Sequence, residues 1–194
     1  MNSIWIYSPH AEIGIWFASL SKFIPHLQLL SHEQVANLEQ EFLNDLPACL
    51  LCLTTLSDRT LRTINEVCHS ANVPLVVADQ IGSDFQIGPG VIFGKTACVA
   101  CFEQQKQYFP FNGFAPYSDL DARLSDTLIE QLAQRLSAEL IAFTEETSTS
   151  SLRQGKLIRI DPNTGNEWQI RGVKSPICEV CSIWAKNPLE AVHL

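Results

Sequence analysis

The sequence has little positive charge. It carries 13 Lys and Arg against 21 Asp and Glu, so the 194 residues have a formal net charge of −8 at pH 7. A surplus of negative charge repels phosphate groups, and we therefore expect no binding to nucleic acid or to an anionic membrane surface. For the chain as a whole, a basic peptide is electrostatically the easier partner.

The sequence also lacks long hydrophobic runs. Its apolar stretches are far shorter than the ~20 residues with which a helix crosses a bilayer. Residues 1–7 carry no basic residue before their apolar run, which argues against a secretory signal. We therefore expect a cytoplasmic protein. In a reducing compartment its seven cysteines are better explained by metal binding or burial than by disulfides.

Hydrophobic residues make up 46% of the chain, which is enough for the core of one domain. Strands and helices are expected to alternate in the first part, with strands at 3–8, 26–30, 48–54 and 73–78 and helices at 11–23, 33–43 and 57–68. This order predicts an α/β fold built on a truncated, Rossmann-like parallel sheet. Residues 48–54 are nearly all apolar, as in a strand that is buried on both faces.

The second part of the chain has a different pattern. Glycine-rich turns separate two short strands expected at 85–87 and 91–93, and residues 104–118 are expected to be irregular. A leucine stripe predicts a long helix over 119–145, followed by a hairpin with strands at 156–160 and 168–171. We therefore divide the chain into a shortened Rossmann-like half, residues 1–97, and a second part, residues 98–194, which holds the helix and the hairpin.

Two pairs of cysteines have the spacing of metal ligands. Two residues separate Cys98 from Cys101, and two separate Cys178 from Cys181. One chelating loop can present both sulfurs of such a pair to an ion, and two loops complete a tetrahedral four-thiolate site. Four protein ligands leave no open coordination position. The pattern thus predicts one structural zinc ion, which closes the second part and tethers the C-terminal hairpin to the middle of the chain.

Two other interpretations of these pairs stay open, ordinary buried cysteines and a redox dithiol. Neither pair is expected to open a helix, which is the context that a redox dithiol needs. A third pair, Cys49 and Cys52, falls inside an expected strand, where residues three apart point to opposite faces and cannot share an ion. We expect Cys49, Cys52 and Cys68 to lie in the core.

Several short motifs follow one another in an order found in one protein family. They are residues 48–55, 65–68, 73–76, Gly82 and 96–101, followed by 155–161, 164–165 and 176–181. In order and spacing they resemble the ubiquitin-activating-type (ThiF/MoeB-like) adenylyltransferases, which include bacterial enzymes of thiamine and molybdopterin biosynthesis. The resemblance implies a Rossmann-like domain and a zinc ion on the same four cysteines.

The stretch after the first expected strand departs from that family. Adenylate-forming members have a glycine-rich loop there, whose backbone N–H groups bind phosphates. Residues 8–14 contain one glycine, Pro9 removes a donor, and Glu12 would repel phosphate. The aspartate that helps to hold magnesium in the family aligns with Leu56. We expect ATP chemistry to be lost, and we assign no catalytic or cofactor-binding residue.

A zinc-bearing member without nucleotide chemistry is similar to the partner proteins of azole-forming (thiazole/oxazole) microcin synthetases in ribosomal-peptide pathways. The resemblance implies a non-catalytic scaffold or precursor-peptide-recognition subunit, in a homodimer or hetero-oligomer with a cyclodehydratase or another modifying enzyme. Residues 1–45 are too few for a winged-helix leader-binding module plus half a Rossmann fold, so another subunit could hold the leader. Two alternatives remain, an ATP-dependent adenylyltransferase acting on a peptide or sulfur-carrier C-terminus, and a structural adaptor without peptide substrate.

Three further candidates stand beside more ordinary interpretations. His10 and Glu12 could form an acid–base pair, although a polar turn explains them more simply. Asp79 follows an expected buried strand, where α/β sheets place ligands, but a turn residue is the simpler reading. An aromatic cluster on an expected loop could be a docking surface or a cover for the core; its members are Phe109, Phe111 and Phe114.

Overall fold

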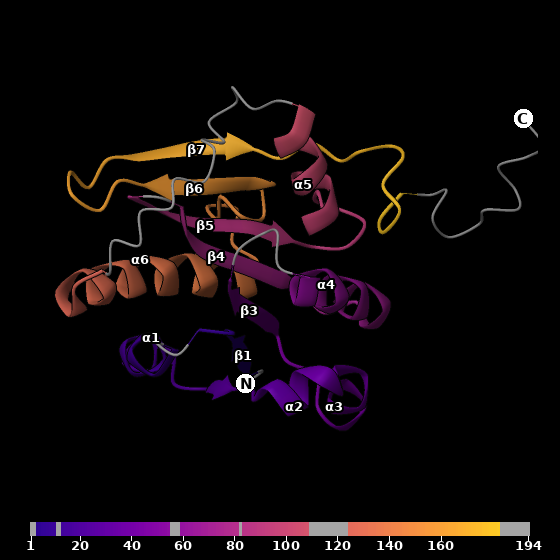
Figure 1. Ribbon diagram of the computed structural model, residues 1–194, viewed down its shortest axis with the longest axis horizontal. Coiled ribbons are helices and arrows are strands. Elements are labelled where there is room, and N and C mark those ends of the chain that lie inside the picture. The colour runs from indigo at the N-terminus through magenta and orange to yellow at the C-terminus, as the bar shows by residue number, and fades with distance from the viewer. Residues whose placement is uncertain (1–2, 11–12, 55–58, 82, 109–123, 183–194) are drawn as a thin grey trace, which may run out of the picture.

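A seven-stranded sheet forms the middle layer of the protein (Figure 1). The computed structural model describes residues 3–10, 13–54, 59–81, 83–108 and 124–182. The strands lie in the order β2-β1-β3-β4-β5-β6-β7. Their bounds are β1 Ile4–Tyr7, β2 Leu27–Leu29, β3 Cys49–Leu53, β4 Leu75–Ile81, β5 Asp84–Val91, β6 Lys156–Ile160 and β7 Glu167–Arg171.

Helices cover both faces of this sheet (Figure 1). One face carries α1 (Ile13–Leu20) and α6 (Asp126–Thr144), which contact each other. The other face carries α2 (His32–Ala36), α3 (Leu38–Asn44), α4 (Arg59–Ala71) and α5 (Val99–Tyr108). Among the described helices, none combines the length and the apolar composition that a membrane crossing requires.

The sheet is parallel at one end and antiparallel at the other. Strands β2, β1, β3 and β4 run parallel, and β5, β6 and β7 are added antiparallel. The predicted α/β class with a Rossmann-like parallel sheet is confirmed. The predicted hairpin is β6 and β7, and it extends the same sheet through β5. A division of the chain at residue 97 stays a prediction.

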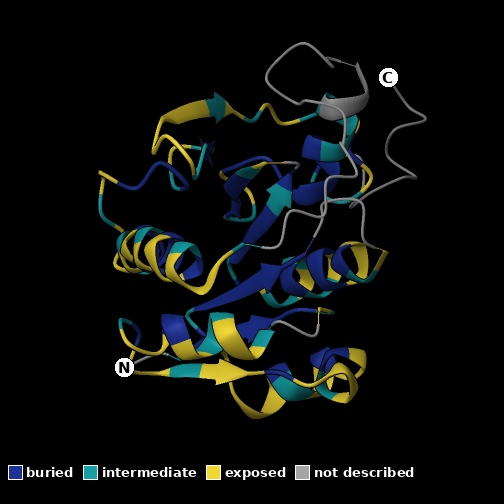
Figure 2. Ribbon diagram, turned by 60° about the vertical axis from the view of Figure 1, so that its left-hand side comes forward, coloured by how far each residue is buried: buried dark blue, intermediate teal, exposed yellow. Residues whose placement is uncertain are grey.

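Strand β3 separates two hydrophobic cores. All five residues of β3 are buried. Leu50 and Cys52 lie in the core under α2 to α5, whereas Cys49, Leu51 and Leu53 lie in the core under α1 and α6. Figure 2 shows the central strands as buried between helices with exposed outer faces. The structure thus places Cys49 and Cys52 in opposite cores, as the two-residue period of a strand requires.

The prediction of two short strands after Asp79 was wrong. A single strand, β5, covers this stretch, and its Gly88-Pro89 peptide bond is cis. A Cβ added at Gly90 would lie 2.5 Å from the Cβ of Leu152. The glycine therefore allows a close approach of the chain before β6 and does not mark a turn, which the sequence pattern alone does not distinguish.

Two helix predictions also needed correction. The helix expected over 33–43 is interrupted at Asn37, which ends α2 and precedes α3. The stretch expected to be irregular from residue 104 belongs at its start to α5. Helix α5 has its apolar residues in the first turn and polar ones after it, so no apolar stripe indicates a helix there. The long helix is confirmed as α6, but it begins at Asp126 after the capping residue Ser125, and not at 119 as expected.

A buried carboxylate fixes the turn between α6 and β6. Glu139 is 5% exposed. It accepts hydrogen bonds from the Ser150 hydroxyl at 2.8 Å and the Leu152 N–H at 3.1 Å. Arg135 approaches the same carboxylate at 3.4 Å and supplies a compensating charge. The turn at 150–155 is consequently held against α6. Its residues 153–155 line a hollow at the surface.

Candidate metal centre

Four cysteine sulfurs meet beside α5. The sulfurs of Cys98, Cys101, Cys178 and Cys181 all lie within 4.8 Å of one another. Cys98 Sγ is 3.8 Å from Cys101 Sγ and 3.5 Å from Cys178 Sγ, and Cys101 Sγ is 3.4 Å from Cys181 Sγ. The structure therefore brings together all four predicted ligands, across a separation of 80 residues in the chain.

These separations match a tetrahedron of thiolates. Four sulfurs at 2.3 Å from a central zinc ion lie about 3.8 Å from one another. A disulfide would require about 2.0 Å, and all four cysteines are free. Three of the four sulfur-bearing residues are buried, and Cys181 is partly buried. The cluster has the size, donor set and enclosure of a structural metal site.

Local backbone bonds shape the two cysteine-bearing loops. Cys98 precedes the first residue of α5, and its carbonyl accepts the N–H of Phe102 at 3.2 Å. In the second loop the N–H of Cys178 donates to the Ser175 carbonyl at 3.2 Å. The N–H of Ser175 donates to the Cys101 sulfur at 3.3 Å. Such an N–H···S bond orients a thiolate and offsets part of its charge.

Three cysteines of the cluster differ in the pKa of their thiols. Hydrogen bonds from the thiols of Cys181 and Cys98 lower the pKa of Cys101 to about 2. The same contacts with Cys101 raise the pKa of Cys98 and raise that of Cys181 to about 12. The Cys101 thiol therefore loses its proton more readily than the thiols of Cys98 and Cys181. A divalent cation that replaces these protons would bind the sulfurs as thiolates.

One argument against a redox dithiol proved wrong for the first cysteine pair. That pair was not expected to open a helix, yet Cys98 stands directly before α5 and Cys101 lies in its first turn. The sequence pattern did not predict this helix, because α5 lacks an apolar stripe. What favours a metal site is that each sulfur of the first pair contacts a sulfur of the second, at 3.5 and 3.4 Å.

The remaining cysteines lie outside the cluster. Cys49, Cys52 and Cys68 are fully buried in the two cores. Burial raises the pKa of Cys49 and of Cys68, so both stay protonated thiols. Their assignment to the core is confirmed.

The structure describes two of the weaker candidates for functional residues, Asp79 and His10. Asp79 is not a turn residue, because β4 continues to Ile81 and Asp79 pairs with Gln86 across the sheet. The N–H of His10 donates to the Ser8 hydroxyl at 3.1 Å, as in a polar turn. The other members of these candidate groups lie outside the described residues; they are Glu12, Phe109, Phe111 and Phe114.

Contacts that the sequence did not reveal hold the second loop against α5. Phe102 is buried, and a Cβ added at Gly172 would lie 2.0 Å from its ring. The Gln105 amide donates to the Arg171 carbonyl at 3.2 Å and accepts the Val173 N–H at 3.0 Å. These contacts depend on α5, which the sequence pattern did not predict.

The fold is shared with two kinds of solved proteins. A heterocyclase in complex with substrate and cofactor matches 93% of this chain at 13% identity and a TM-score of 0.66. Escherichia coli MccB matches 94% at 15% identity and 0.62, and MccB with ATP gives 0.63. The heterocyclase TruD matches 93% at 15% identity and 0.59. No protein-family model and no curated protein sequence matches this chain.

The chain is shorter than these neighbours. Its match spans 25% of the first heterocyclase, 27% of TruD and 65% of MccB. At identities of 13–15% the likeness shows a common fold. The sheet and the cysteine cluster of this chain therefore stand on a fold that heterocyclases and MccB also have.

We expect Gly172→Ala to destabilise the protein. The new methyl group would collide with the buried Phe102 ring, and overpacking of this kind lowers the free energy of unfolding by about 1–3 kcal/mol. Chemical denaturation measures the change. The matched control is Gly14→Ala in α1, where no atom lies within 4 Å of the added Cβ. This substitution should leave stability unchanged or raise it slightly. Equal denaturation midpoints for Gly172→Ala and the wild type would contradict the packing described here.

Proposed function

We propose that Cys98, Cys101, Cys178 and Cys181 hold one structural zinc ion. Four thiolates in tetrahedral array favour zinc over the harder divalent cations, which prefer oxygen ligands. The three sulfur–sulfur distances of 3.4–3.8 Å support this proposal. Such an ion would fasten the segment after β7 to the start of α5, and its binding energy would contribute to folding.

We further propose that the chain is a non-catalytic, zinc-binding scaffold or precursor-recognition subunit of a heterocyclase complex in a ribosomal-peptide pathway. The observation that carries this proposal is the four-cysteine cluster on a fold also found in two heterocyclases. Its partners would be a cyclodehydratase or another modifying enzyme and a precursor peptide, in a homodimer or hetero-oligomer.

The carboxyl ends of the parallel strands support a role without catalysis. Ligands of α/β sheets bind at these ends. Here the buried Tyr7 ends β1, and its hydroxyl lies 3.1 Å from Nδ1 of His32 at the start of α2. The edge-on contact between the Tyr7 and His32 rings thus occupies the space between β1 and α2. It lies beside the turn that contains Pro9, which has no backbone N–H to donate to a phosphate.

A second candidate function is ATP-dependent activation of a peptide or sulfur-carrier C-terminus. The likeness to E. coli MccB, whose structure with ATP has the same fold, favours this candidate. A structural adaptor without peptide substrate is the third. The three functions predict different ligands and partners, so binding experiments separate them.

We expect about one zinc ion per chain in the purified protein and almost none in Cys178→Ser. The substitution removes a thiolate and should also lower the free energy of unfolding, because zinc binding and folding are coupled. Elemental analysis and thermal denaturation measure the two effects. Cys68→Ala is the control, since this buried thiol lies outside the cluster, and it should retain the zinc. Equal zinc contents in both variants would contradict the assignment of the ligands.

The heterocyclase role predicts that the full chain does not bind ATP–magnesium in isothermal titration. It also predicts that the tagged chain, captured from its native host, retains a peptide-modifying enzyme. Micromolar ATP binding would favour the adenylyltransferase instead. Recovery of the chain without any modifying enzyme would favour the adaptor.

A further inference from the structure

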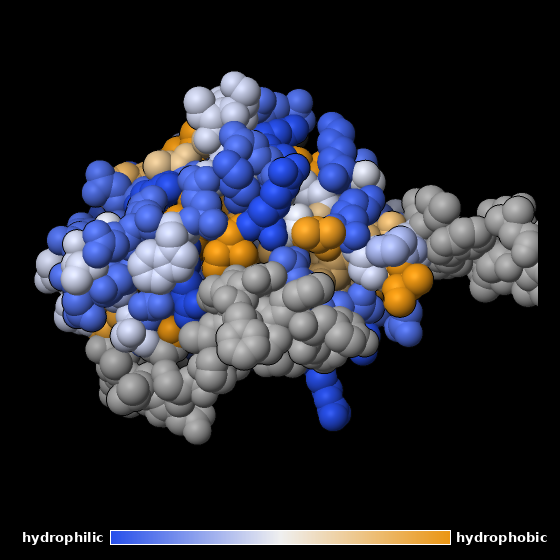
Figure 3. Space-filling view, turned by 90° about the horizontal axis from the view of Figure 1, so that it is seen from above, coloured by the Kyte–Doolittle hydropathy of each residue, from blue (hydrophilic) through white to orange (hydrophobic). Residues whose placement is uncertain are grey.

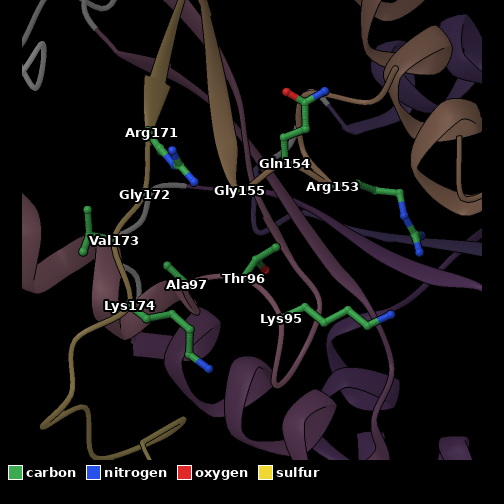
Figure 4. Close-up of a pocket in the computed structure, with 10 residues that line it drawn as sticks. All are labelled: Lys95, Thr96, Ala97, Arg153, Gln154, Gly155, Arg171, Gly172, Val173 and Lys174. Atoms are coloured by element: carbon green, nitrogen blue, oxygen red, sulfur yellow. The ribbon is translucent and has the colours of Figure 1, made fainter. Parts of the chain in front are cut away.

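A hollow lies next to the cysteine cluster and is bordered by positive side chains (Figure 4). Its volume is about 480 Å³, within the usual range of ligand sites. Three segments that are far apart in the sequence line it, residues 95–97, 153–155 and 171–174. The first of them leads into Cys98, and the last precedes Cys178, so both cysteine-bearing loops contribute a wall.

The charge of this hollow is opposite to that of the whole chain. Lys95, Arg153, Arg171 and Lys174 line it, and none of its ten lining residues is acidic. The chain as a whole carries a net charge of −8. Arg153 is already paired with Glu146 at 2.9 Å. Lys95, Arg171 and Lys174 are exposed and remain the cations that face a ligand.

Hydrogen bonds to backbone carbonyls hold the walls in place. The N–H of Gly172 donates to the Gly155 carbonyl at 2.8 Å and joins two of the segments. The buried Thr96 hydroxyl donates to the Gly90 carbonyl at 2.9 Å. Lys174 Nζ donates to the Gly94 carbonyl at 3.2 Å, which uses one of its three protons. The hollow is therefore formed before any ligand arrives.

Two like charges face each other at the edge of the hollow. Lys156 of β6 lies directly opposite Arg171 of β7. Like charges directly opposite in an antiparallel pair are destabilising. The Lys156 ammonium donates a hydrogen bond to Oε1 of Gln169 at 3.1 Å, which directs it away from Arg171. An anion near the Arg171 guanidinium would relieve the remaining repulsion.

We propose that this hollow binds the carboxylates of an acidic polypeptide segment. Figure 4 shows the Lys95 side chain extending to one side of the hollow and Arg171 and Lys174 on the other. Cations that are spread in this way suit several separate carboxylates better than one compact phosphate. None of the ten lining residues is aromatic, so the hollow offers no surface on which nucleobases could stack, and a peptide is the better fit than a nucleic acid.

The structure also indicates how such a segment would be held. An extended peptide could add a strand to β7, but the Gln105 amide already occupies the Arg171 carbonyl and the Val173 N–H at this end of the strand. Binding would therefore use side chains. Val173 lines the hollow, is 64% exposed and offers an apolar contact beside the cations. Figure 3 shows apolar groups scattered among hydrophilic ones on the described surface, seen from above.

The proposal goes beyond the proposed function, because it concerns a surface outside the cysteine cluster and does not require a heterocyclase partner. The test uses the metal-loaded full chain and a fluorescein-labelled peptide of alternating Glu and Gly, with fluorescence anisotropy as the readout. The same peptide with Gln in place of Glu should bind at least about fivefold more weakly. Arg171→Gln/Lys174→Gln should weaken binding of the Glu peptide by about fivefold.

Lys22→Gln/Arg59→Gln is the matched control, because it removes the same charge from exposed positions on α4 and after α1. This variant should bind the Glu peptide as the wild type does. Each variant loses one exposed contact, Lys22 with Glu130 or Lys174 with the Gly94 carbonyl, and circular dichroism should show the wild-type fold in both. Equal loss in the two variants would overturn the proposal, as would equal affinity for the Glu and Gln peptides. Stronger displacement by inorganic phosphate than by chloride at equal ionic strength, or tighter binding of an oligonucleotide of equal charge, would also overturn it.

Discussion

Four sulfur atoms from two loops 80 residues apart meet beside α5 and connect the segment after β7 to the middle of the chain. From Gly172 to Ile177 this segment is mostly exposed, so it buries little apolar surface. Contacts among four cysteine sulfurs hold the segment in place where apolar packing is weak; these cysteines are Cys98, Cys101, Cys178 and Cys181. A metal ion there would contribute on the order of 10 kcal/mol in favourable cases, which exceeds the net stability of many domains.

This tether has consequences for the edge of the sheet. Strand β7 contributes mostly exposed side chains. It is positioned by β6 on one side and by the Phe102 and Gln105 contacts of α5 near its end. Because the cysteine loops and the basic hollow share these contacts, loss of the cluster would disturb both. The sheet thus joins buried parallel strands, β1 and β3, to an antiparallel edge strand whose side chains are mostly exposed.

The sequence predicted those features that leave a local pattern. The buried strand β3, the parallel order, helix α6 and the final hairpin all follow from residue periodicity, and the four cysteines from their spacing. The single strand β5 was missed because Gly90 makes room for Leu152, a residue distant in the chain. Helix α5 was missed because it lacks an apolar stripe, and the basic hollow because three separate segments form it.

X-ray absorption fine structure at the zinc edge identifies the atoms bound to the metal. If the four cysteines bind zinc, the purified chain shows a shell of four sulfur atoms at about 2.3 Å. Nitrogen or oxygen ligands at about 2.0 Å in place of sulfur, or a protein without zinc that keeps its fold, would contradict zinc binding by the four cysteines.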